Sequence, residues 1–314
     1  MISRLRVLVF VLIVVFTFFF KFFFVARLSF VKPDPDAYGY IELAQKMSGF
    51  YGASVREPLF VLWNKIWFGI SKDNLYSVRI ASVFAYSISA IFIFLILRRI
   101  FDENYALIGG IFYLYIPYSF ISHLRGLRLE FFLMLLLASV YFTLFFLLQK
   151  KWGSILTGIV YGFLLLTRME SFIFIFFSIF YIFAFMKGDV KKKLISVAVA
   201  LGVAFVVSFP FYFNCFKEKG SFFYVLNYHS KFWFSHEFAG TPKGKPPEIS
   251  LENPYSVDMN FFRYIFKERD FLDIPKKVIN GYAELFKNAM PHILRVPVDF
   301  CCLLYTSDAA DELD

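Results

Sequence analysis

The feature that most limits what this chain can fold into is a succession of apolar runs separated by short charged stretches. The first run is about 20 residues long, enough for a helix to cross a bilayer. Similar runs recur along the chain, and we identify about seven apolar segments in all. These segments cover 7–26, 78–97, 106–122, 129–148, 153–167, 171–186 and 194–213. The sequence therefore predicts an all-α integral membrane protein, a multi-span helical bundle.

Composition supports a membrane protein and argues against a nucleic-acid partner. The chain has 314 residues, of which 59% are hydrophobic and 22% aromatic, with 47 phenylalanines. This is too apolar for a soluble protein of this length. The formal net charge of +9 comes with basic residues that lie in short runs between the apolar segments, where membrane topology explains them. We therefore predict no nucleic-acid binding.

The basic runs also predict an orientation. Arg4 and Arg6 precede the first apolar segment, and further basic runs follow the second, fourth and sixth segments. They are Arg98 and Arg99, Lys150 and Lys151, and the lysines between 187 and 193. The short segments 153–167 and 171–186 are either two crossings or a re-entrant pair, and in both cases the chain returns to the side it left. Because basic loops stay in the cytoplasm, we expect a multi-pass plasma-membrane protein with a cytoplasmic N-terminus. Residues 27–77 then form the first external loop.

Three regions follow from this topology. Residues 1–213 form the predicted transmembrane domain, and 214–301 form an external segment with helices expected near 261–267 and 276–287. The stretch from Cys302 to Glu312 resembles a translated sequencing adapter, so we treat 302–314 as foreign. On that interpretation the external segment is truncated and the natural protein continues beyond Phe300.

The first external loop carries two amphipathic helices in the prediction. Asp34 and Pro35 are typical of a helix start, with Asp34 as the cap and Asp36 in the first turn. There the positive end of the helix dipole favours an ionised carboxylate. The alternative is that both aspartates only begin a helix. Glu57 and Pro58 open the second helix, whose apolar stripe includes two tryptophans that suit the membrane interface.

Charged residues collect on the predicted external side, several of them at the ends of apolar segments. They are Asp34, Asp36, Arg56, Glu57, Arg125, Arg128, Glu130, Arg168 and Glu170. Charges at such depth cost roughly 2.5 to 3.5 kcal/mol each unless they are paired or hydrated, so they predict a wet cavity. For Arg168 the alternatives are snorkelling and an ion pair with Glu170. For Arg125 and Arg128 the alternative is ordinary solvation in a loop.

Such a cavity suits a lipid-borne phosphate whose reactive end faces outward. Arginine binds phosphate through paired donors, and a carboxylate serves as general base toward an incoming hydroxyl. The four histidines lack metal-binding spacing, so a divalent metal remains open only through carboxylates, and no cofactor is indicated with certainty. The sequence has no phosphate-binding glycine loop and no nucleophile elbow.

Four short motifs, in order, resemble the N-terminal membrane half of the C-superfamily (GT-C fold) glycosyltransferases, which include protein mannosyltransferases and lipid A aminoarabinose transferases. The first places Asp36, Tyr40 and Ala44 four residues apart in the first external loop. The others are Arg56 to Phe60, Leu127 to Glu130, and Leu166 to Glu170. Met169 stands where the family usually has proline. The resemblance covers residues 1 to about 230.

The resemblance implies an inverting sugar transfer from a polyprenyl-phosphate donor to a glycan, lipid or protein acceptor at the external face. It makes Asp36 the base and Arg56 and Arg168 the phosphate ligands, and it leaves metal dependence open. The remaining expected substrate-binding residues are Asp34, Tyr40, Glu57, Arg128, Glu130 and Glu170.

Two other functions remain open from the residues. A flippase or transporter of polyprenyl-linked lipids also needs charges that face a cavity. Against it, transporters usually show repeated halves, and here the charges cluster at one face. A glycan polymerase or ligase of another membrane fold is the second alternative.

Overall fold

The computed structural model describes residues 2–27, 32–69, 73–116, 118–150, 152–238, 255, 258–267, 279–280, 283 and 287. Within these residues every regular element is a helix. The chain divides into two compact units, Met1–Phe222 and Phe223–Asp314. Each unit is considered by itself.

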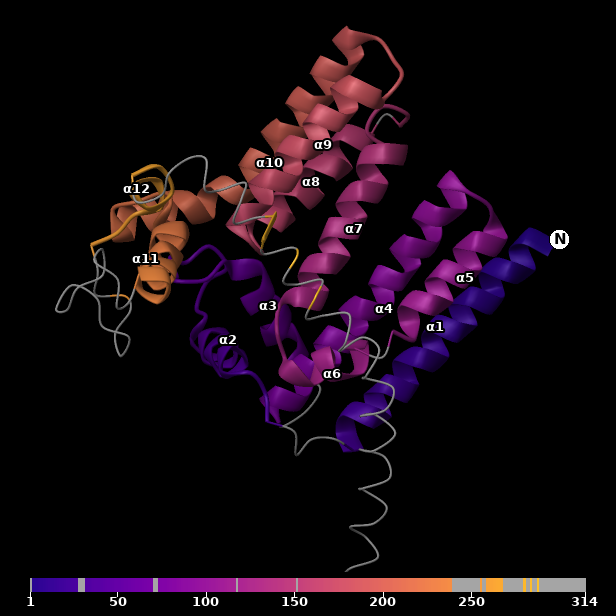
Figure 1. Ribbon diagram of the computed structural model, residues 1–314, viewed down its shortest axis with the longest axis horizontal. Coiled ribbons are helices and arrows are strands. Elements are labelled where there is room, and N and C mark those ends of the chain that lie inside the picture. Colours follow the sequence, from indigo (N-terminus) through magenta and orange to yellow (C-terminus); the bar gives the residue numbers. More distant parts are fainter. Residues whose placement is uncertain are drawn as a thin grey trace, which may run out of the picture. The chain divides into compact units, whose positions relative to one another are not determined.

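The first unit begins with three packed helices. They are α1 (Ile2–Arg27), α4 (Asn74–Ile100) and α5 (Glu103–Leu114). Their shared core contains Phe10, Tyr86 and Phe94, with the rings of Phe10 and Phe94 stacked 4.3 Å apart. Figure 1 shows these helices running side by side. Both α1 and α4 are long and apolar enough to cross a membrane.

A second group of helices is joined to the first through α4 and α7. It consists of α7 (Leu129–Phe145), α8 (Gly153–Leu165), α9 (Phe172–Phe185) and α10 (Val190–Lys219). The third long apolar helix is α10, whereas α7, α8 and α9 are shorter. The predicted helical membrane bundle is confirmed in this form. The exact number of crossings stays a prediction.

Small residues bring α8 and α10 close together. A Cβ added at Gly158 would lie 2.5 Å from the carbonyl oxygen of Ala200, and one added at Gly162 would lie 2.7 Å from Val207. Glycine at this spacing allows two helix backbones to approach each other in a membrane. The helix α10 continues past Pro210 to Lys219, beyond the segment end expected at 213.

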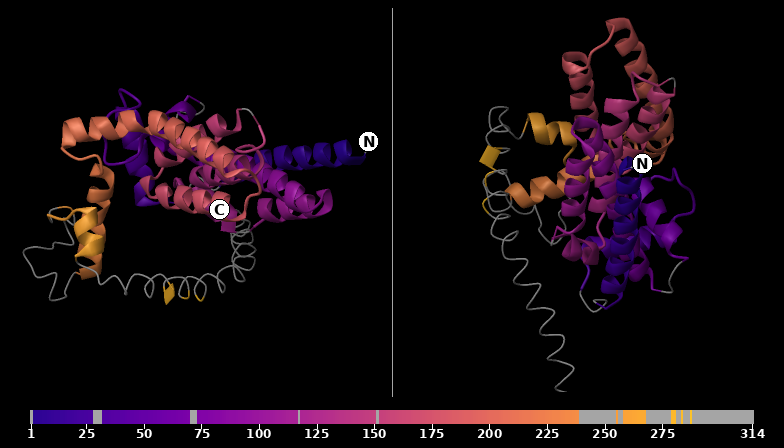
Figure 2. Two further views of the ribbon diagram at one scale, coloured as in Figure 1. Left: turned by 90° about the horizontal axis from the view of Figure 1, so that it is seen from above. Right: turned by 90° about the vertical axis from the view of Figure 1, so that its right-hand side faces the viewer.

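The helix ends of the first unit fall into two groups at opposite ends of the bundle. Near the N-terminus of α1, Glu103 pairs with Arg98 at 2.7 Å and with Arg6 at 3.9 Å. The opposite end of α1 leads to α2 (Pro35–Lys46) and α3 (Pro58–Trp67), as Figures 1 and 2 show. The short helix α6 (Tyr118–Arg125) lies there too, and Arg125 accepts a backbone hydrogen bond from Asp34. The loop helices α2 and α3 therefore lie at the opposite end of the bundle from Arg6 and Arg98.

Both amphipathic loop helices are confirmed. Phe60 and Val61 form the buried face of α3. The two tryptophan rings also contact the bundle, Trp63 at 4.9 Å from Phe131 and Trp67 at 5.1 Å from Phe84. This packing fixes α3 on top of α4 and α7.

The second unit contains α11 (Tyr224–Phe238) and α12 (Phe261–Phe266), which pack through Phe234, Met259 and Tyr264. The helix expected near 261–267 is confirmed. The helix expected at 276–287 lies mostly outside the described residues, and the tail 302–314 lies wholly outside them.

Candidate functional site

The helix α2 holds Asp36 in a fixed direction. Asp34 caps the helix by accepting a hydrogen bond from the backbone N–H of Asp36 at 3.1 Å, with Pro35 in the first turn. The backbone N–H of Asp34 donates to the carbonyl of Arg125 at 3.2 Å. Gly126 has φ of 69°, and a Cβ there would lie 3.2 Å from that of Ala37. The turn after α6 therefore fits closely beneath the start of α2.

Asp36 is the exposed acid of the site, and Arg56 is its partner. The guanidinium Nη2 of Arg56 lies 3.1 Å from Oδ1 of Asp36, whose side chain is 55% exposed. The same guanidinium lies 5.2 Å from the centre of the Tyr40 ring. Tyr40 is buried and packs edge-on against Phe60. An accessible carboxylate thus stands beside a cation held on an aromatic face.

A second ion pair joins the buried Glu57 to Arg128, whose side chain is 14% exposed. Glu57 is 1% exposed and accepts a hydrogen bond from Arg128 at 2.9 Å and another from the backbone N–H of Met169 at 2.7 Å. Arg128 also donates to the carbonyl of Thr167 at 3.3 Å. Burial raises the pKa of Glu57, Arg128 offsets part of that rise, and Glu170 adds to it. This pair ties the start of α3 to the turn that follows α8.

Arg168 and Glu170 complete the site from that same turn. Arg168 lies 3.8 Å from Glu170 and places its guanidinium 5.4 Å from the centre of the Phe132 ring on α7. The Arg168 side chain is 36% exposed. The ion pair with Glu170 that the sequence offered as an alternative is therefore present, at a separation too long for a strong hydrogen bond.

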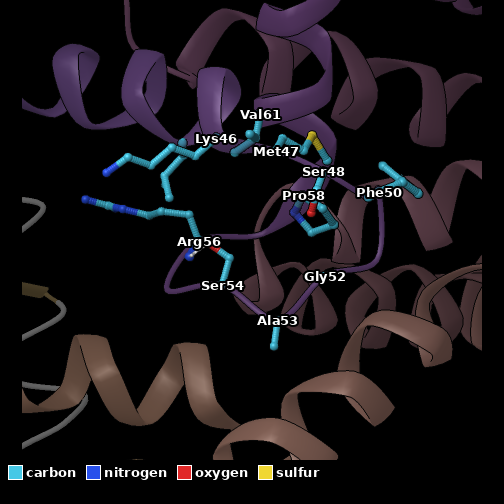
Figure 3. Close-up of a pocket in the computed structure, with 12 residues that line it drawn as sticks. Lys46, Met47, Ser48, Phe50, Gly52, Ala53, Ser54, Arg56, Pro58 and Val61 are labelled. Carbon is cyan, nitrogen blue, oxygen red and sulfur yellow. Dashed lines mark hydrogen bonds between the residues drawn. The ribbon is translucent and has the colours of Figure 1, made fainter.

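Beside the Asp36–Arg56 pair lies a pocket of about 230 Å³. The C-terminal half of α2 and the segment 48–56 line it, with Met47 and Pro58 on its apolar side. Figure 3 shows Lys46 and Arg56 extending in the same direction along it. Arg56 therefore borders both the pocket and the carboxylate of Asp36.

Tyr51 fastens the segment 48–56 to the bundle. Its hydroxyl donates to the carbonyl of Val207 at 3.1 Å, and its carbonyl accepts from the side chain of Asn214 at 2.9 Å. Both partners belong to α10. The loop that carries Arg56 is thus anchored to α10 at Tyr51.

Comparison with known protein families identifies the group to which this arrangement belongs. The model of the dolichyl-phosphate-mannose-protein mannosyltransferase family matches residues 56–212. The chain belongs to this family. It is accordingly a multi-pass membrane glycosyltransferase that uses a polyprenyl-phosphate sugar donor, and the resemblance seen in the sequence is confirmed. No curated protein and no solved structure matches the chain.

The mannosyltransferase family match covers one part of the site and omits another. It includes the two ion pairs formed by Glu57 with Arg128 and by Arg168 with Glu170. It begins at Arg56, so α2 and Asp36 lie outside it. The assignment of a role to Asp36 therefore depends on its geometry.

The structure separates Glu130 from these residues. Its carboxylate points into the bundle, 3.6 Å from Nδ1 of His123, whose Nε2 lies 3.3 Å from Nζ of Lys21. Lys21 also donates to Ser119 at 2.6 Å and lies 4.0 Å from the centre of the Tyr86 ring. We name Lys21, His123 and Glu130 the buried polar cluster. The sequence prediction had placed Glu130 in one external cavity with Asp36.

Lys21 and His123 are the members that sequence reasoning missed. A signal for Lys21 was present, because it is the only charged residue in the apolar run 7–26. An ionisable residue within a membrane segment usually faces the bundle interior and a partner. His123 was set aside because it had no metal-binding spacing. Among the described residues, no group of three His, Cys, Asp or Glu side chains is placed to hold a metal ion.

Proposed function

We propose that this mannosyltransferase-family protein transfers a sugar with inversion from a polyprenyl-phosphate donor to an acceptor outside the plasma membrane, with Asp36 as general base. The acceptor is a hydroxyl or amine of a glycan, lipid or protein. Its lone pair attacks the anomeric carbon, and the bond from that carbon to the phosphate oxygen breaks. The electron pair leaves on polyprenyl phosphate, and Asp36 takes the acceptor proton.

The exposure of Asp36 is the observation that supports this role best. A base has to come within hydrogen-bond distance of the group it deprotonates. Asp36 is the acid of the site whose side chain is more than half exposed, whereas Glu57 is buried and already accepts two hydrogen bonds. The capped first turn of α2 keeps the direction of Asp36 fixed, which lowers the cost of orienting it toward an acceptor.

We assign the donor phosphate to Arg56 and Arg168. Both guanidinium groups lie over aromatic rings, are only partly exposed and are each paired with a carboxylate. A guanidinium binds phosphate through paired N–H donors. A phosphate that binds Arg56 shares the cation with Asp36. The carboxylate is then less tightly held and more able to accept a proton.

The test is transfer from a radiolabelled polyprenyl-phosphate mannose in proteoliposomes of the full chain. In the Asp36→Asn variant the rate of polyprenyl phosphate release should fall by a factor of about 10² to 10⁴, which is the usual contribution of a general base. The labelled lipid should still bind to the variant. If Asp36→Asn retains normal transfer, another residue is the base. If the wild-type protein moves intact labelled lipid across the membrane without cleaving it, the transporter is the correct function.

The external location can be tested separately. Ser54 borders the pocket beside Asp36 and is partly exposed. We expect Ser54→Cys to react with a membrane-impermeant maleimide on intact cells, as the cysteine lies on the external side in the predicted topology. Labelling that requires lysis would place the site in the cytoplasm and reverse the orientation.

A further inference from the structure

An apolar groove of about 360 Å³ lies between α7 and α9. The α7 wall contains Leu136, Val140 and Leu144, and the α9 wall contains Phe174 and Phe177. Phe174 is 44% exposed and Phe177 is 61% exposed, so the α9 side is open toward the surroundings of the bundle. In a membrane protein those surroundings are lipid chains.

Three of the hydroxyl groups that line this groove, those of Ser139, Thr143 and Ser178, are hydrogen-bonded within the protein. Ser139 donates to the carbonyl of Leu136 at 2.7 Å, and Ser178 donates to that of Phe174 at 2.8 Å. Thr143 is hydrogen-bonded to the hydroxyl of Tyr161 at 2.8 Å. None of these three groups needs a polar ligand. The groove therefore offers a hydrocarbon surface despite the polar residues in its wall.

One end of the groove reaches the phosphate-binding arginine. Phe174 lines the groove, and its ring lies 6.1 Å from that of Phe132. Phe132 in turn carries the guanidinium of Arg168 on its face. From Phe132 to Leu144, α7 rises about 18 Å, which is over half of the roughly 30 Å hydrocarbon core of a bilayer. A cation thus stands at the mouth of an apolar channel that descends into the membrane.

We propose that the groove between α7 and α9 binds the prenyl chain of the donor lipid while Arg168 binds its phosphate. This rests on the proposed function and specifies which helices hold the lipid. The charge and the shape agree with one occupant, an anionic head group on a single long hydrocarbon chain. The opening along α9 lets that chain enter sideways from the bilayer, so it never leaves an apolar environment.

The first experiment compares donors that differ only in chain length. Val140→Trp places a large ring in the groove, far from the charged residues of the site. We expect Val140→Trp to raise KM about tenfold for a long-chain polyprenyl-phosphate mannose. A tenfold change corresponds to the loss of roughly two buried methylene contacts. The KM for a short-chain analogue should stay unchanged. Ile108→Trp is the matched control, because Ile108 is 66% exposed on α5. Equal KM changes for both donors would overturn the proposal.

A second readout does not depend on transfer or on the Val140 variant folding. A polyprenyl phosphate with a benzophenone on its chain should label peptides from α7 and α9 in both the wild-type protein and Asp36→Asn. A phosphatidylcholine carrying the same group should label them much less. Equal labelling by both probes would show an ordinary lipid contact and refute the groove assignment. Normal transfer by Asp36→Asn with selective labelling would refute the base and retain the groove.

Discussion

Two sets of charged residues lie at the same end of the bundle, yet they differ in contact with water. At the surface, Asp36 is 55% exposed and is paired with a partly exposed Arg56. In the buried polar cluster, the Glu130 side chain is 5% exposed and His123 is 1% exposed. Lys21 belongs to the same cluster and is also buried. The first set is accessible from outside the protein, and the second is closed.

This comparison indicates that burial, more than the number of charges, decides whether a charged residue is accessible to a ligand or links helices to one another. An exposed ion pair contributes little to stability, so breaking it to bind phosphate costs little. A buried charge that loses its partner is strongly unfavourable, so a cluster of such groups resists rearrangement. The buried polar cluster joins the neighbouring helices α6 and α7 to α1, and Lys21 on α1 lies 102 residues before His123 on α6.

The largest expected effect separates the two acids directly. Asp36→Asn should lower turnover by about 10² to 10⁴ while the thermal unfolding of the protein stays nearly unchanged. Glu130→Gln should do the reverse, with lower stability and transfer per folded molecule within a few-fold of wild type. Both are measured on purified protein with the folded fraction counted. If Glu130→Gln abolishes transfer in molecules that remain folded, the comparison between the two sets fails.

The next effect concerns Glu57 and Arg128, which combine features of both sets. Arg128→Met should lower the free energy of unfolding by about 3 to 5 kcal/mol, because it leaves Glu57 buried without its cation. Burial raises the pKa of Glu57, so without Arg128 the folded protein binds more protons than the unfolded chain. The stability of the variant should therefore fall as the pH rises through the raised pKa of Glu57.

The control for Arg128 is Lys46, whose ion pair with Glu42 is exposed. Lys46→Met should change stability by less than about 0.5 kcal/mol. A similar loss in both variants would mean that the buried pair has no special role.

A smaller effect tests whether the buried polar cluster acts as a unit. Lys21→Met and Glu130→Gln should each destabilise the protein, and the double variant should be more stable than the sum of the two losses predicts. Such coupling is typically about 0.5 to 3 kcal/mol for groups in one network. Denaturant unfolding in detergent of the wild type and the three variants completes the cycle. Strict additivity would show that Lys21 and Glu130 act independently.

Much of the fold follows from local sequence signals, whereas the separation of the two charge sets does not. Apolar length predicts the long helices, and Asp34 followed by Pro35 predicts the start of α2, because these depend on residues near in sequence. The inward direction of Glu130 depends on meeting His123 and Lys21, and Lys21 lies more than 100 residues away. A pattern along one helix does not specify which neighbouring helix a charged face will meet. The groove between α7 and α9 is hidden for the same reason.

The smallest expected effect tests whether Asp34 serves the site only by supporting Asp36. Asp34 accepts the hydrogen bond from the backbone N–H of Asp36 and is not a member of the ion pairs described above for the site. Asp34→Asn preserves the cap and should leave both stability and transfer close to wild type. Asp34→Ala removes it and should cost about 1 kcal/mol, with a few-fold loss of transfer as the first turn of α2 loosens. Chemical denaturation and donor turnover measure the two effects on the same samples. A loss of transfer in Asp34→Asn as large as in Asp36→Asn would move the base to Asp34, and the capped helix would then have to open before the reaction.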